Sequence, residues 1–167
     1  MKNITKTIMY LQMTALFLTA ALAGPVAAGA EVPFKGRLEG FFTVTPLVPP
    51  FARVLIEATG NATHLGRFKV ENRHVVPFGT SGSGSYEFTA ANGDTLTADF
   101  TITATPTPDG LFIVVEIATI TGGTGRFDGA TGSFTVIRLL DRATRFTSGS
   151  FDGSIVIHKA KQTVRTK

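Results

Sequence analysis

Apolar and polar residues alternate one by one along most of this chain, and no window repeats with the 3.6-residue period of a helix. Period-two alternation places successive side chains on opposite faces of a β-strand. The clearest case is the segment 95–105, where leucine, alanine, phenylalanine and isoleucine take every second position and threonine or aspartate the others. Such a strand buries one face and exposes the other. The chain is therefore predicted to be all-β.

Turn signals divide the chain into about eight strand-like segments, a spacing typical of a sandwich or a barrel. The strongest signal is Asn92-Gly93, which joins the segments 83–90 and 95–105. Asn-Gly favours a type I′ turn, in which both central residues have positive φ. We therefore expect a tight hairpin at this position.

Residues 1–30 have the features of a signal peptide: a lysine-containing start, an apolar run at 8–23 and a small-residue cleavage site. We expect cleavage before Glu31 or, almost equally, before Gly29. The run is shorter than the ~20 residues that a membrane-spanning helix needs, and an uncleaved anchor is the alternative. The protein is therefore expected to be secreted or periplasmic, with no membrane contact after cleavage.

After the leader we expect one β-barrel domain at 31–158 and a basic tail at 159–167. The cations of the tail fit either an anionic partner or a solvated terminus. No aromatic platform accompanies them, so no nucleic-acid partner is predicted. The chain has no cysteine, which removes disulfides and thiol chemistry.

Two segments depart from alternation, because 111–120 and 134–140 are apolar on both faces. A strand of this kind needs something to cover its outer face. Either a loop or terminus of the same chain folds over it, or it forms a subunit interface.

Between these segments lies the run Ile120-Thr-Gly-Gly-Thr-Gly-Arg-Phe-Asp-Gly-Ala-Thr-Gly-Ser-Phe134. It contains no Gly-Lys-Ser/Thr and no amphipathic helix follows it, so a phosphate-binding loop is excluded. Its glycines instead suit positive φ angles or close approach of strands, and its phenylalanines suit anchors. The residues expected to form this structural motif are Gly122, Gly123, Gly125, Phe127, Gly129 and Gly132.

The stretch from Thr121 to Gly132 resembles the glycine-rich hairpin of the allene oxide cyclase and dirigent barrels, whose pattern is roughly T/V-G-G-S/T-G-x-F-x-G-A-x-G. The resemblance implies an eight-stranded antiparallel, lipocalin-like barrel, often trimeric, with a pocket for an apolar small molecule. The eight segments counted above agree with it. Eight strands enclose a space just wide enough for packed side chains or one small ligand.

Five polar residues are candidates for the inside of such a barrel. Tyr86 lies on the predicted core face, and Asn72 and His74 follow the parity of apolar neighbours. Glu116 and Arg138 fall on strands that should be adjacent, so they either meet as a buried pair or lie on the outside. The cost of burying charge favours the surface or an interface for both.

The three histidines lack metal-ligand spacing, so no metal site is predicted, and no cofactor is expected. Three functions remain open. The preferred one is a non-catalytic binder of an apolar small molecule. The second is a cyclase, isomerase or dirigent-like enzyme, which a polar residue facing the lumen would favour. The third is a structural or surface-interaction protein, which a fully packed lumen would favour.

Overall fold

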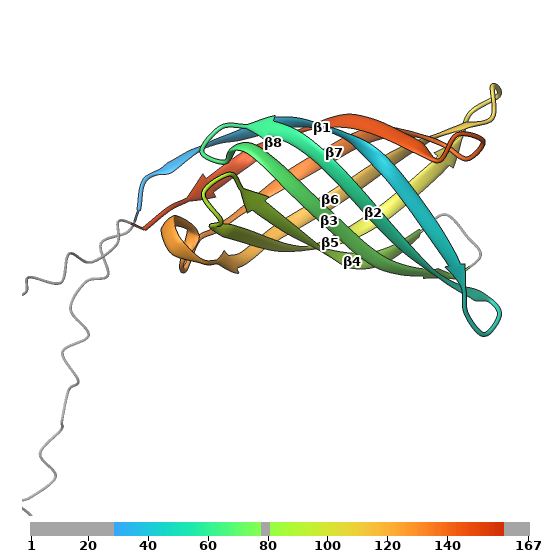
Figure 1. Cartoon of the computed structure of the whole chain (residues 1–167), viewed down its shortest axis with the longest axis horizontal. Coiled ribbons are helices and arrows are strands. Elements are labelled where there is room, and N and C mark those ends of the chain that lie inside the picture. Colours follow the sequence, from blue (N-terminus) through green and yellow to red (C-terminus); the bar gives the residue numbers. More distant parts are fainter. Residues whose placement is uncertain (1–28, 78–80, 159–167) are drawn as a thin grey trace, which may run out of the picture.

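The computed structural model describes residues 29–77 and 81–158, so almost all of the predicted signal peptide and the basic tail lie outside the described residues. Eight antiparallel strands form a closed barrel in which each strand pairs with the next in sequence (Figure 1). The all-β barrel prediction is confirmed. The strands are β1 Glu31–Pro46, β2 Phe51–Ala62, β3 Gly66–Pro77, β4 Ser81–Ala90, β5 Thr95–Pro106, β6 Leu111–Gly123, β7 Thr131–Asp141 and β8 Phe146–Val156.

The barrel closes because the first strand pairs with the last. In β1 and β8, Phe34 lies opposite Gly153 and Phe41 opposite Phe146. Closure leaves no strand of the sheet with a free edge, which satisfies backbone donors and acceptors along the whole barrel.

Alternation determines which side chains fill the barrel. Inward positions carry an aromatic cluster in one half of the lumen: the ring centroid of Phe34 lies 5.3 Å from that of Phe134 and 5.0 Å from that of Phe151. Phe68 and Phe88 join the same cluster, with centroids 5.3 Å apart. Aromatic pairs of this geometry contribute roughly 0.5–1.5 kcal/mol each beyond the area they bury. This half of the barrel is packed solid.

The glycine-rich run folds over one end of the barrel as a short loop with a 3-10 turn, η1, at Gly125–Phe127. Figure 1 shows it in orange at the end where β1 begins. Phe127 is fully buried beneath it. Arg126 ties the loop to two other turns, because its Nη2 donates to the carbonyl of Leu65 (3.2 Å) and its amide to the carboxylate of Asp94 (3.3 Å). The loop therefore closes this end.

The motif glycines have the mechanical role that the sequence predicts. Gly132 has φ 141°, and a Cβ there would lie 2.3 Å from the carbonyl oxygen of Ser154. Gly123 has no positive φ, but a Cβ would lie 2.1 Å from the carbonyl oxygen of Thr95. Positive φ is also found at Gly122, Gly125 and Gly129.

The predicted hairpin at Asn92-Gly93 is present, but the type I′ assignment is wrong. Four residues link β4 and β5, and only Gly93 has positive φ (89°). The amide of Gly93 donates to the carbonyl of Ala90, and the amide of Ala90 donates to the carbonyl of Asp94 (both 2.9 Å). This is the pattern of a type I turn followed by a glycine bulge, which suits a slightly longer connection.

The outer surface of β6 and β7 is apolar and open. Ile117 and Ile137 are 63% and 55% exposed, and Ile113 and Leu139 are 41% and 48% exposed. No described segment of the chain covers these four side chains, which we call the outer apolar face. The first of the two alternatives, a loop or terminus of the same chain, is therefore not found among residues 29–77 and 81–158, and the subunit interface stays a prediction.

Candidate functional site

A buried ion pair lies at the centre of the barrel. Glu116 projects inward from β6 and is 0% exposed, and Arg138 projects inward from the neighbouring β7 and is 2% exposed. The Arg138 Nη2 donates to Glu116 Oε1 (2.7 Å) and its Nε donates to Oε2 (3.0 Å). The expectation that both charges lie at the surface or an interface is wrong. That expectation rested on the cost of desolvating two charges, and the two hydrogen bonds of the ion pair offset part of this cost.

The register of the strands brings these two residues together. In the β6–β7 ladder Arg138 lies opposite Val114, and Glu116 lies opposite Val136, so the pair is diagonal by two residues on the inner face. The third prong of the guanidinium, Nη1, donates to the hydroxyl of Thr147 (3.1 Å) on β8. That hydroxyl donates onward to the carbonyl of Leu139 (2.7 Å). Thr147 is a member of the cluster that sequence reasoning missed.

The opposite wall supplies the other three predicted candidates. Tyr86 donates its phenol hydrogen to Glu116 Oε2 in a short hydrogen bond, and Asn72 Nδ2 donates to Oε1 (3.0 Å). The His74 Nδ1 lies 2.8 Å from Asn72 Oδ1. Because that amide oxygen can only accept, Nδ1 must carry the hydrogen. All five candidates thus form one hydrogen-bonded cluster.

This arrangement leaves one polar atom available. Both carboxylate oxygens of Glu116 and every guanidinium nitrogen of Arg138 have partners. His74 Nε2 has no hydrogen bond among the described residues. Among those residues, the only fully buried side-chain nitrogen or oxygen without a partner is His158 Nδ1. His74 Nε2 is therefore not fully buried, and a ligand can reach it. With Nδ1 protonated, Nε2 is a bare acceptor.

The protonation states follow from burial and charge. Burial lowers the pKa of His74 to about 4, so the imidazole is neutral at pH 7. Burial alone would raise the pKa of Glu116, but the attraction and hydrogen bonds of Arg138 outweigh it and lower that pKa. Burial, followed by the nearby charge of Glu116, raises the pKa of Tyr86, so its phenol remains a donor. The cluster therefore holds a fixed pattern of donors and acceptors at neutral pH.

His74 and Arg138 form the polar part of a small chamber of about 90 Å³. The chamber lies at the end of the barrel away from the glycine-rich loop, where β1–β2, β5–β6 and β7–β8 turn. Apart from Arg142 at its rim, the rest of the lining is apolar: Phe42, Val44, Val54, Val76, Ile102, Ala104, Phe112, Val114 and Leu140. The lumen is thus packed in one half and hollow in the other.

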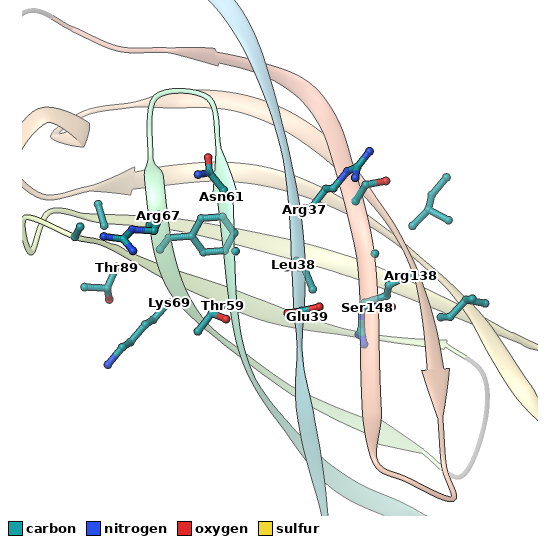
Figure 2. Close-up of a pocket in the computed structure, with 18 of the residues that line it drawn as sticks. Arg37, Leu38, Glu39, Thr59, Asn61, Arg67, Lys69, Thr89, Arg138 and Ser148 are labelled. Atoms are coloured by element: carbon teal, nitrogen blue, oxygen red, sulfur yellow. The ribbon is translucent and has the colours of Figure 1, made fainter.

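A larger hollow of about 1390 Å³ lies on the outside of the barrel, and its lining comes from β1, β2, β3, β4, β6, β7 and β8. Figure 2 shows exposed side chains along it, including Arg37, Glu39, Asn61 and Lys69. It is wide and open to solvent, and Arg138 is the one member of the cluster described above in its lining. Ile113, Ile137 and Leu139 of the outer apolar face also line it. A site needs convergent polar groups in a sheltered space, and the inner chamber meets that requirement better.

The described residues contain neither a metal-binding group nor a membrane-spanning helix. No group of three or more acidic or histidine side chains there could hold a metal ion. No helix in residues 29–77 and 81–158 is long and apolar enough to cross a membrane.

Several solved structures share this architecture, and two dirigent proteins are among them. The pterocarpan synthase dirigent protein PsPTS1 matches with a TM-score of 0.60 and 11% identity, over 79% of this chain and 98% of that chain. The pterocarpan synthase dirigent protein GePTS1 matches with a TM-score of 0.57 and 13% identity, over 79% of this chain and 93% of that chain. The fold is a dirigent-like barrel.

At this identity the likeness establishes the fold alone, and it supports the dirigent side of the predicted resemblance without pointing to allene oxide cyclases in particular. The sequence matches no protein-family profile. It also matches no curated protein.

Proposed function

We propose that this dirigent-like barrel binds a small, largely apolar molecule in the chamber and receives a hydrogen bond from a hydroxyl of that molecule at His74 Nε2. The observation that carries the proposal is the fixed tautomer of His74. Its Nδ1 is committed to Asn72, so Nε2 is the acceptor that the cluster leaves open beside the chamber. Because Nε2 is accessible and has no hydrogen-bond partner among the described residues, it is free to accept a hydrogen bond from a ligand that donates one.

The size of the chamber limits what enters. Sites for drug-sized ligands usually measure about 300–1,000 Å³, well above the 90 Å³ found here. Only a compact group, or one end of a longer molecule, fits between the apolar walls. The remainder of a longer ligand would lie at the mouth of the barrel.

Binding without chemistry is favoured over catalysis by the state of the cluster. The carboxylate of Glu116 is fully engaged, so it has no free lone pair directed at a ligand. His74, with a pKa of about 4, is a weak base at neutral pH, and general bases work best when their pKa lies near the operating pH. The barrel would hold a ligand in one orientation and leave its bonds intact.

A dirigent-like enzyme is the second candidate, and a specific observation supports it. Charged and polar side chains face the lumen, as the enzyme hypothesis requires, and two of them, His74 and Arg138, line the chamber. A reactive intermediate bound at His74 would be oriented by the same hydrogen bond. Conversion of a bound probe to product would favour the enzyme, and recovery of the unchanged probe would favour the non-catalytic binder.

The test uses 4-methylphenol and its methyl ether, which differ in the hydroxyl hydrogen. Titration of ¹⁵N-labelled protein should shift the His74 ring nitrogens with the phenol and leave them unchanged with the ether. His74→Phe should abolish phenol binding, whereas His64→Phe, an exposed histidine in a turn, should not. Equal binding of phenol and ether, or no response of chamber residues at millimolar phenol, would overturn the proposal.

We also propose that the protein acts outside the cytoplasm and as a homo-oligomer. The predicted signal peptide supports export, and the outer apolar face supports contact with a second copy, because exposed apolar patches often mark interfaces. Native mass spectrometry of protein purified from its source would report the processed N-terminus, the subunit count and a co-purified ligand together.

A further inference from the structure

Two arginines lie beside the chamber, Arg142 in its lining and Arg145 over the ring of Phe42, and the binding site described above does not use them. Both come from the turn between β7 and β8, residues 142–145. The Arg142 Cζ lies 4.2 Å from the ring centroid of Phe112, and the Arg145 Cζ lies 5.5 Å from that of Phe42. These two rings line the chamber. Stacking on aromatic rings holds each guanidinium at the rim.

Neither guanidinium has an acidic partner among the described residues. The acids in the nearby turns are engaged elsewhere. The carboxylate of Asp141 accepts from the Thr144 hydroxyl and the Ala143 amide, and these bonds lower its pKa. Asp109 accepts from Thr107 within its own turn. Two cations thus face solvent beside an apolar opening.

The backbone shows that Arg145 occupies a demanding position. Its φ is 63°, in the left-handed region that glycine adopts most easily. Its carbonyl accepts from the amide of Phe42 (3.0 Å), which fixes the turn against the rim of β1. Strained backbone conformations at a rim are often part of a ligand-binding arrangement.

We infer that Arg142 and Arg145 recognise an anionic group, so that the ligand is an amphipathic carboxylate with its hydroxyl-bearing apolar end in the chamber. This inference rests on the proposed function, because it assumes that the hydroxyl-bearing end of the ligand is bound at His74. A ligand that is too long for the chamber places its other end at the mouth, beside the two arginines. Guanidinium groups match carboxylates in geometry and charge.

The experiment compares 3-(4-hydroxyphenyl)propionate with its methyl ester, which keeps the phenol and removes the charge. The wild-type protein should bind the carboxylate about tenfold more tightly at low salt, with the difference shrinking as salt rises. The double variant Arg142→Gln/Arg145→Gln should lose that difference and bind the ester as the wild type does. Arg37→Gln, on the outer surface away from the mouth, is the matched charge control.

The outcomes separate the two proposals. If the wild type binds both probes equally, or if the double variant keeps the preference for the carboxylate, the anion inference is wrong and the hydroxyl site at His74 stands. If neither probe binds the wild type, the hydroxyl site is wrong and the anion inference is overturned with it. Thermal unfolding of the double variant should match that of the wild type, because both arginines are exposed.

Discussion

Arg138 and Glu116 form a forked ion pair inside the barrel, with Arg138 Nη2 2.7 Å from Glu116 Oε1 and Nε 3.0 Å from Oε2. The pair separates two regions of different character. On one side lie the phenylalanines that fill the closed half, and on the other lies the chamber next to His74. The polar cluster is therefore the floor of the chamber as well as part of the core.

Breaking this pair from one side should be costly. Glu116→Leu leaves the guanidinium of Arg138 buried without a countercharge, and Arg138→Met does the same to the carboxylate, so each variant should lose roughly 3–5 kcal/mol of unfolding free energy. The double variant Glu116→Leu/Arg138→Met should lose much less than the sum of the two. Urea unfolding of all four proteins measures the coupling. Additive losses would show that the pair contributes no interaction energy.

The buried imidazole predicts a fall in stability under mildly acidic conditions. His74 titrates at about 4 in the folded protein, against 6.5 for an ordinary histidine. Between these values the unfolded chain binds a proton that the folded chain does not, so the unfolding free energy decreases as the pH falls from 6.5, by up to about 3 kcal/mol at pH 4.

Denaturant unfolding at half-unit pH steps checks this prediction, with His74→Gln as the comparison. Glu116, whose pKa is lowered in the fold, adds to the loss only below its ordinary value of 4.5. The interval from pH 6.5 to 4.5 therefore isolates the histidine. A variant with the same slope as the wild type in that interval would contradict the assignment.

Two glycines of the loop provide a matched test of backbone strain against steric clash. Gly122 and Gly132 have nearly equal φ, 138° and 141°. A Cβ at Gly122 meets nothing within 4 Å, whereas one at Gly132 would press on the carbonyl of Ser154. Gly122→Ala should cost about 1–3 kcal/mol from strain, and Gly132→Ala at least about 1 kcal/mol more. Equal losses measured by urea unfolding would exclude the clash.

The outer apolar face predicts a change in assembly on a single substitution. Ile137→Lys places a charge at the centre of that face and should dissociate the proposed oligomer, with little effect on the fold because this side chain is 55% exposed. Ser85→Lys, on the outer face of β4, serves as the control. Light scattering coupled to size-exclusion chromatography reports the mass. A wild-type protein that is monomeric at high micromolar concentration would refute the interface.

Alternation along the strands was sufficient to predict an all-β fold and the inward direction of Tyr86, because polar and apolar faces differ there. The choice of a barrel over a sandwich came from the resemblance of the stretch from Thr121 to Gly132. It was insufficient for Glu116 and Arg138, whose strands are apolar on both faces, so either parity was compatible with the sequence. Closure of the barrel brings three further partners to the pair, Asn72 of β3, Tyr86 of β4 and Thr147 of β8, and their hydrogen bonds offset part of the cost of burying the two charges.

The mouth of the chamber could not be found from the sequence. Arg142 and Arg145 belong to a short polar turn that resembles any solvent-exposed loop, and their significance depends on the rings of Phe42 and Phe112, which come from distant strands. Thr147 likewise offers no signal, since one threonine among many becomes a hydrogen-bond partner only through the register of β7 and β8.

The loop above Phe127 closes one end of the barrel and leaves the chamber at the other. With a single opening, a bound ligand must leave the chamber before another molecule can enter by the same route. Displacement kinetics should therefore be limited by dissociation, and raising the concentration of a competitor should not accelerate the release of a molecule already inside.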